Sequence, residues 1–314
     1  MCNSARCDYN AGFIIVKPNN TSKELYQAVK SVTGESPETD DQVALNNVIN
    51  ALQNRQTGLK VTTLNERRFL SGREYFEKPR RWFPLNSDDK CIEKNYSNCA
   101  AVVHNNWIVG KAAKVYRFRE HLMWLFDGDD QYYTSSTRLY LTYTNKAHTD
   151  RKLFNKRRAI RAESEISALK TAMTIGYLLN RTVILPKFRV GQRALQNPLN
   201  SFIHIKTFDS EFSGKYRESI FLRHPKVPPQ VTYGLYEQAV VMDGTVSSTS
   251  SHPNVTVSGF DILRQFGEIK ARVLAVSSLH NIKVVLENSN GDVAFSKKLD
   301  RAFFRSDYRQ GKQW

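Results

Sequence analysis

The residue with the clearest potential for chemistry is a histidine at the end of a short apolar run. Residues 100–103 are Ala-Ala-Val-Val, His104 follows them directly, and Gly110, Lys111 and Lys114 come soon afterwards. An imidazole can ligate a divalent cation, and a lysine ammonium group can neutralise phosphate oxygens. The spacing is therefore suited to a site for a metal-bound diphosphate. A purely structural histidine is the alternative that these residues leave open.

A strand must hold this histidine, and a helix must carry the lysines. The run 100–104 predicts the strand, and apolar residues at helical spacing after Lys111 predict a basic helix. The other elements expected in this part are a buried strand over 11–17, a helix capped by Thr21, a helix capped by Thr39 or Asp40, and a short strand over 61–64.

The second part of the chain alternates strand and helix patterns. A strand over 139–144, a helix over 162–177 and a strand over 182–185 predict a βαβ unit with parallel strands. The later elements expected are strands over 238–242, 273–276 and 282–286 and a helix over 260–269. The fold class is therefore predicted to be α/β.

Charge is distributed unevenly over the 314 residues, whose formal net charge is +16. Residues 1–130 contribute +2 and residues 131–314 contribute +14. The shift predicts a domain boundary near residue 130, which divides the chain into domains 1–130 and 131–314. An excess of basic residues suits a polyanionic partner such as an acidic glycan or a nucleic acid. No recognised nucleic-acid motif accompanies the charge, so nucleic-acid binding ranks last among the functions considered.

The sequence lacks the motifs that are typical of several enzyme classes. There is no G-x-G-x-x-G, no G-x-x-x-x-G-K-S/T, no G-x-S-x-G and no H-E-x-x-H. Rossmann dehydrogenases, P-loop NTPases, serine hydrolases and zincins therefore lose their main support. The four cysteines, Cys2, Cys7, Cys91 and Cys99, do not have zinc-site spacing and could form disulfides or remain free thiols.

Three segments, in order, resemble the nucleotide-diphospho-sugar transferase family of GT-A glycosyltransferases. They are N-A-G-F-I-I-V at residues 10–16, D-D-Q-V-A-L-N at 40–46 and H-N-N-W-I-V-G at 104–110, which is followed by Lys111 and Lys114. The resemblance covers roughly residues 1–125 and has a plant arabinosyltransferase- or xylosyltransferase-like character.

The resemblance implies a role for each matching residue. Donor binding is implied for Asn10, Gly12, Gly110, Lys111 and Lys114. Asp41 and Gln42 would lie by the transferred sugar and the acceptor, and His104 would ligate Mn²⁺ (or Mg²⁺). The implied activity is transfer of a sugar from a UDP-sugar to a hydroxyl of a glycan or glycoprotein.

One departure from the family pattern affects these expectations. The D-x-D element that binds the metal and the UDP phosphates in GT-A enzymes is expected before the N-A-G-F segment. The sequence Asp127-Gly128-Asp129 follows His104 instead and is interpreted as linker. We therefore expect an incomplete GT-A domain from a longer Golgi-lumenal type II protein, whose membrane anchor lies outside this chain. The alternative is a pseudo-glycosyltransferase that only binds glycan.

The second part has a resemblance of its own. Residues 172–186 are similar to C-terminal regions of arabinosyltransferase-like proteins and to the first βαβ unit of O-fucosyltransferase-like folds. A second, Rossmann-like α/β domain is the fold that this implies. Lys206, Arg217, Arg223 and His224 are interpreted as surface charge, with a glycan or sugar-nucleotide cleft as the alternative.

Overall fold

The protein is described from a computed structural model. It describes residues 9–35, 38–66, 68–77, 100–106, 108, 110–124, 131–144, 158–188, 203–233, 235–239, 255–277, 279, 282–287 and 289–303, with side chains from 165 in the helix that begins at 158. Contacts divide the chain into two units, one of Met1–Phe76 with Arg80–Trp107 and one of Glu77–Pro79 with Ile108–Trp314. Each unit is described by itself.

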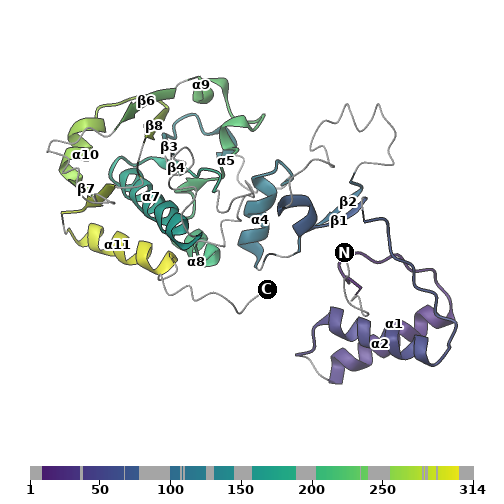
Figure 1. Ribbon diagram of the computed structural model, residues 1–314. Coiled ribbons are helices and arrows are strands. Elements are labelled where there is room, and N and C mark those ends of the chain that lie inside the picture. Colours follow the sequence, from purple (N-terminus) through teal and green to yellow (C-terminus); the bar gives the residue numbers. More distant parts are fainter. Residues whose placement is uncertain are drawn as a thin grey trace. The chain divides into compact units, whose positions relative to one another are not determined.

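Two helices are the longest elements in the described part of unit 1. They are α1 (Asn20–Glu35) and α2 (Asp41–Asn54), which lie side by side (Figure 1). The apolar side of α2 is buried at Leu45, Val48, Ile49 and Leu52 and packs with Leu25 of α1. These α2 positions recur every three or four residues, as an amphipathic helix requires.

Side chains from the preceding loop cap both helices. Asp40 accepts from the backbone N–H groups of Gln42 and Val43 at 2.9 and 3.4 Å, as the sequence predicts. Asn19 caps α1 by accepting from the Ser22 N–H at 2.8 Å. The prediction of Thr21 as the cap is therefore wrong by two residues.

A short parallel pair of strands completes unit 1. Strand β1 (Phe69–Ser71) pairs with β2 (Val102–His104), so that Ser71 lies opposite His104. A π-helical turn, η1 (Arg73–Glu77), follows β1. The predicted strand over 100–104 is confirmed. The predicted strands over 11–17 and 61–64 are wrong, and in the first of them Ile15 is 70% exposed.

Unit 2 is built on a five-stranded sheet in the order β5-β4-β3-β8-β6, with every neighbouring pair parallel. The strands are β3 (Tyr140–Thr144), β4 (Thr182–Ile184), β5 (Tyr216–Arg217), β6 (Leu235–Ala239) and β8 (Val273–Ser277). The long helix α7 (Arg158–Leu178) connects β3 to β4 and lies across the sheet (Figure 1). The predicted parallel βαβ unit is therefore confirmed.

Further helices and a second parallel pair surround this sheet. The pair is β7 (Val255–Ser258) with β9 (Ile282–Val285). The helices are α4 (Lys111–Arg119), α5 (Gln131–Thr134), α8 (Ile205–Glu211), η5 (Phe221–Arg223), α9 (Pro229–Thr232), α10 (Gly259–Phe266) and α11 (Asn290–Ala302). Mixed helices and parallel sheets in both units confirm the predicted α/β class.

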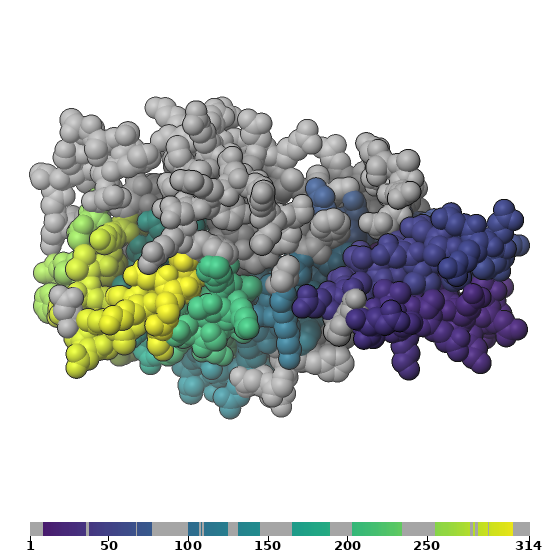
Figure 2. Space-filling model, turned by 90° about the horizontal axis from the view of Figure 1, so that it is seen from below, coloured from purple at the N-terminus to yellow at the C-terminus, as the bar shows by residue number. Residues whose placement is uncertain are grey.

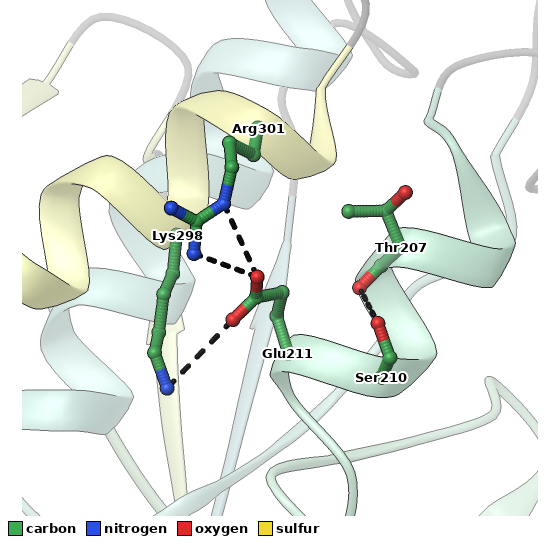
Figure 3. A network of polar contacts seen from close by, with 5 residues as sticks. All are labelled: Thr207, Ser210, Glu211, Lys298 and Arg301. Carbon is green, nitrogen blue, oxygen red and sulfur yellow. Dashed lines mark hydrogen bonds and ion pairs between the residues drawn. The ribbon is translucent and has the colours of Figure 1, made fainter.

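Helices α8 and α11 lie side by side on one face of unit 2 (Figure 2). Glu211 at the end of α8 joins them, as Figure 3 shows. Its carboxylate pairs with Arg301 at 2.7 Å and with Lys298 at 3.7 Å, both from α11. A bridge between Ile203 and Phe303 adds a backbone connection beside the same two helices.

The predicted boundary near residue 130 remains a prediction. The contact division falls at Trp107 and Ile108, so α4 lies in unit 2, where it packs against α8. None of the helices in the described part of the chain is both long and apolar enough to cross a membrane.

Candidate functional site

A turn at the start of unit 1 is attached to the N-terminal half of α2. The Asn46 side chain accepts from the Tyr9 N–H at 2.6 Å and donates to the Tyr9 carbonyl at 2.8 Å. Gln42 accepts from the Ala11 N–H at 3.4 Å. Asn10 closes the turn by accepting from the Gly12 N–H at 2.8 Å. The N-A-G-F and D-Q segments, about thirty residues apart in sequence, are therefore in contact.

The same turn lies against His104. A Cβ atom added to Gly12 would overlap the His104 ring, so only glycine allows this approach without a shift of the imidazole. Phe13 adds a second contact, this time with β1, the strand paired with β2. Its ring centroid is 5.4 Å from that of Phe69. The first and third motif segments thus meet at the carboxyl end of β2.

The carboxyl ends of β1 and β2 carry the polar groups around the histidine. Ser71 ends β1 opposite His104 and accepts from the Glu74 N–H at 3.2 Å. Asn106 accepts from the Gly72 N–H at 2.7 Å, which ties the segment after β2 to the segment after β1. Ligand sites in open parallel sheets form at the carboxyl ends of strands, so this edge is a favourable place for one.

The two acidic residues before Gln42 differ in role. Asp40 is the helix cap described above, which gives its carboxylate a structural function. Asp41 is the first residue of α2 and is exposed. An anionic side chain in the first turn also interacts favourably with the helix dipole. The structure therefore supplies a structural explanation for Asp40, whereas Asp41 remains accessible.

The predicted diphosphate-binding residues lie in the other unit. Gly110 precedes α4 with φ of +88°, a conformation that favours glycine. Lys111 and Lys114 are exposed on the first turn of α4. Of the eight predicted site residues, Asn10, Gly12, Gln42 and His104 are brought together in unit 1, and Asp41 adjoins Gln42 on α2.

The described side chains near His104 offer few ligands for a metal ion. Among the residues that the structure describes, no three His, Cys, Asp or Glu side chains lie close enough together to hold a metal ion. Protein metal sites of divalent cations usually use several such ligands or oxygen donors from the substrate. His104 by itself could provide one nitrogen ligand, so the described side chains do not form a complete metal centre.

Residues 2–118 match the family model of the nucleotide-diphospho-sugar transferases. The match covers the turn, α2, β2 and nearly all of α4, which are the segments that carry the eight predicted residues. It supports the family resemblance for this segment, which is a little over a third of the chain. Comparisons with curated proteins and with solved structures returned no match.

A second polar cluster, in unit 2, was not predicted. Glu218, directly after β5, is fully buried and accepts hydrogen bonds from Tyr132 at 2.7 Å and Tyr133 at 3.5 Å. Arg217 is also buried, with its Cζ atom 4.0 Å from the centroid of the Tyr132 ring. Its interpretation as surface charge is therefore wrong.

Glu120 and Tyr116, both from α4 or its C-terminal cap, lie close to this cluster. The Glu120 carboxylate accepts from the Ser219 hydroxyl at 2.9 Å. Burial raises the pKa of Glu120 from 4.5 to about 7. Burial also raises the pKa of Tyr116 well above its ordinary value, and both Glu120 and Glu218 add to that rise. No local sequence pattern signals this cluster, because its members come from segments nearly a hundred residues apart.

Proposed function

We propose that the full protein transfers a sugar from a UDP-sugar to a hydroxyl of a glycan or glycoprotein, and that residues 2–118 contribute part of the donor site. The family match supports a nucleotide-sugar donor and glycosyl transfer. The convergence of Gly12, Gln42 and His104 is the structural observation that carries the proposal. That the nucleotide of the donor is UDP, and that the acceptor is a glycan or glycoprotein, are both proposed.

In this proposal the chain's residues bind and orient the donor. Gly12 leaves space at the turn, where a larger residue would displace His104. Asn10 and Gln42 hold that turn through backbone hydrogen bonds, so they are positioning residues in the free protein. Asp41, the first residue of α2, would accept a hydrogen bond from a sugar or acceptor hydroxyl. Lys111 and Lys114 would neutralise the diphosphate.

A divalent cation, Mn²⁺ or Mg²⁺, is included in the proposal as a partner of the donor diphosphate. When bound, such an ion acts as a Lewis acid on the departing diphosphate. His104 would provide one ligand, and phosphate oxygens would provide others. The residues that the structure describes do not complete the ligand set.

Titration of UDP into the full-length protein, with and without Mn²⁺, tests the proposal. We expect Mn²⁺-dependent binding in the wild type, and a loss of at least tenfold in affinity in His104→Ala. His204→Ala is the matched control, because His204 is exposed at the start of α8 in unit 2. Equal Mn²⁺-dependent affinities in the wild type and His104→Ala would refute the assignment of His104 to the donor site.

The proposed setting is the Golgi lumen, and it depends on N-glycosylation sequons at Asn19, Asn20, Asn95, Asn180 and Asn254. Asn180 is exposed and has a positive φ of 48° at the join between α7 and β4. Peptide mapping after expression in the secretory pathway would test it, and at least one of Asn95, Asn180 and Asn254 is expected to carry a glycan. Asn95 and Asn254 lie outside the described residues.

A glycan-binding module without catalysis is the second candidate function. The +14 charge of residues 131–314 favours it, because acidic polysaccharides bind to basic surfaces. Heparin chromatography combined with a transfer assay distinguishes the two. Salt-sensitive retention without any UDP binding would favour the binding module.

A further inference from the structure

The C-terminal end of α4 is attached to the sheet of unit 2 through ionisable side chains. Arg119, the last residue of α4, lies over the Tyr132 ring with 4.1 Å between its Cζ atom and the ring centroid. Glu120, the C-cap, accepts the 2.9 Å hydrogen bond from Ser219 just beyond β5. Tyr116, one turn earlier, lies with its ring centroid 6.3 Å from that of Tyr216 in β5. These contacts hold α4 at the carboxyl end of β5.

The Glu120 carboxyl is a titratable part of this attachment. Burial is the largest cause of its raised pKa, and the negative charge of Glu218 acts in the same direction. The Ser219 hydrogen bond, Lys187 beyond β4 and Arg117 of α4 act in the opposite direction and lower the pKa. The resulting pKa of about 7 places the change of charge of Glu120 in the neutral range.

One polar group at the end of α4 lacks a hydrogen bond to the described residues. The Tyr116 hydroxyl is buried and has no hydrogen-bond partner among the residues that the structure describes. A buried polar group without a partner is costly, and local opening of α4 would allow water to reach it. The end of α4 therefore combines the partly buried carboxyl of Glu120 with a buried hydroxyl that has no partner in the described part of the chain.

Two histidines, His121 and His224, lie near the cluster and serve as controls for Glu120. The ring nitrogen Nδ1 of His121 lies 2.7 Å from the Arg117 carbonyl oxygen. The acceptor is a carbonyl, so Nδ1 carries the proton in that bond. His224 stacks on Tyr133 at a centroid distance of 3.7 Å. Both histidines require control variants.

We propose that ionisation of Glu120 loosens the attachment of α4 to the parallel sheet, so that the helix carrying Lys111 and Lys114 opens more often as pH rises. The protonated carboxyl adds no charge to the cluster. The carboxylate adds a negative charge beside Glu218 in surroundings of low dielectric constant. Opening of α4 returns that charge to water, so the ionised form favours the open state. An effect on donor binding through the two lysines would rest on the proposed function, but the effect on the helix does not.

The direction and size of the effect follow from the two pKa values. Glu120 binds its proton more tightly in the closed state, with a pKa of about 7, than in an exposed state with 4.5. The closed state is therefore favoured most at low pH and loses this advantage as pH rises through 7. Linkage with these values predicts that the opening equilibrium constant rises about tenfold between pH 6 and pH 8.

Hydrogen exchange of the backbone amides of residues 111–119 in the full chain measures this opening. After correction for intrinsic exchange rates, protection in the wild type is expected to fall about tenfold between pH 6 and pH 8. Glu120→Gln keeps an acceptor for Ser219 but cannot ionise, and its protection should be independent of pH over this range. The controls His121→Gln and His224→Gln should retain the wild-type slope.

Two outcomes would overturn the proposal. One is a Glu120→Gln variant whose protection falls with pH as in the wild type. The other is a carboxyl resonance of Glu120 that titrates near 4.5 in nuclear magnetic resonance spectra of ¹³C-labelled protein. If the exchange results are as expected but UDP does not bind, the proposed function fails and the pH-dependent attachment of α4 stands.

Discussion

Gly12 lies so close to His104 that a single added methyl group would overlap the imidazole ring. The predicted consequence is that Gly12→Ala displaces the ring of His104 from its place beside the turn. Because a side chain can rotate more easily than a backbone can shift, we expect a destabilisation of about 1 kcal/mol. Imidazole resonances of His104 should move in ¹H–¹⁵N spectra of the variant.

Gly34 provides a matched control for this substitution. It lies within α1, and no atom comes within 4 Å of an added Cβ. Gly34→Ala is therefore expected to stabilise the helix by about 0.5 kcal/mol, since alanine loses less backbone entropy than glycine. An unmoved His104 resonance in Gly12→Ala would contradict the close contact.

The attachment of the N-terminal turn to α2 depends on one buried amide. Asn46 bonds both the N–H and the carbonyl of Tyr9, and it also donates to the Gln42 carbonyl at 2.7 Å. Asn46→Ala leaves these groups without their partner, so a loss of about 1–3 kcal/mol is expected. Hydrogen exchange at residues 9–12 should accelerate, whereas Asn47→Ala, at an exposed neighbouring position, should leave it unchanged.

The elements with a strong local signal were predictable from the sequence. Thr39 or Asp40 was expected as the cap of α2, and the Asp40 carboxylate does accept from N–H groups of the first turn. The order of β3, α7 and β4 follows from two short strand-like runs on either side of apolar residues at helical spacing. In both cases residues close together in sequence decide the structure.

Predictions that depended on distant partners were less successful. Phe13, Ile14 and Ile15 are apolar enough for a buried strand, yet they are 42%, 44% and 70% exposed and form no strand. A strand needs a neighbour for its backbone groups, and local composition cannot provide one. The cluster of Glu120 and Glu218 was missed for a similar reason, because only the tertiary fold brings these residues together.

For the candidate site too, the sequence predicted some contacts and missed the division between the two units. Asn10, Gly12, Gln42 and His104 come from the three motif segments. The structure brings these segments into contact within unit 1. Lys111 and Lys114 follow His104 closely in sequence but belong to unit 2. Proximity in sequence therefore did not reveal that a unit boundary separates the proposed metal ligand from the proposed phosphate-binding residues.

Substitution of the buried Arg181 is predicted to destabilise unit 2 strongly. It is buried, and its guanidinium donates to the carbonyls of Tyr140 at 3.1 Å, Ala271 at 2.8 Å and Ile269 at 2.5 Å. Burial lowers its pKa, but three acceptors compensate for the desolvation. Arg181→Ala should cost about 2–4 kcal/mol, since charge-assisted hydrogen bonds are lost and three carbonyl groups lose a partner.

Thermal unfolding of the full chain provides the measurement for Arg181. Arg264→Ala is the control, because Arg264 is exposed and its pair with Asp261, at 3.2 Å, joins neighbouring turns of α10. Such a surface pair contributes about 0.5 kcal/mol or less. Equal shifts of the melting temperature in the two variants would show that the buried guanidinium does not hold the strand ends together.

The final prediction concerns the ion pairs between α8 and α11 in Figure 3. Glu211 binds Arg301 through both Nε and Nη2, at 3.2 and 2.7 Å, and pairs with Lys298 at 3.7 Å. Glu211→Gln should destabilise unit 2 by about 0.5–1 kcal/mol at low salt, because one carboxylate serves two cations. Asp300→Asn, which removes a single pair with Lys170 at 3.4 Å, should have a smaller effect. At 1 M salt the Debye length is about 3 Å, so the difference between the two variants should largely disappear. A cost of Glu211→Gln that does not change with salt would mean that packing between α8 and α11, and not the charge of Glu211, stabilises this face.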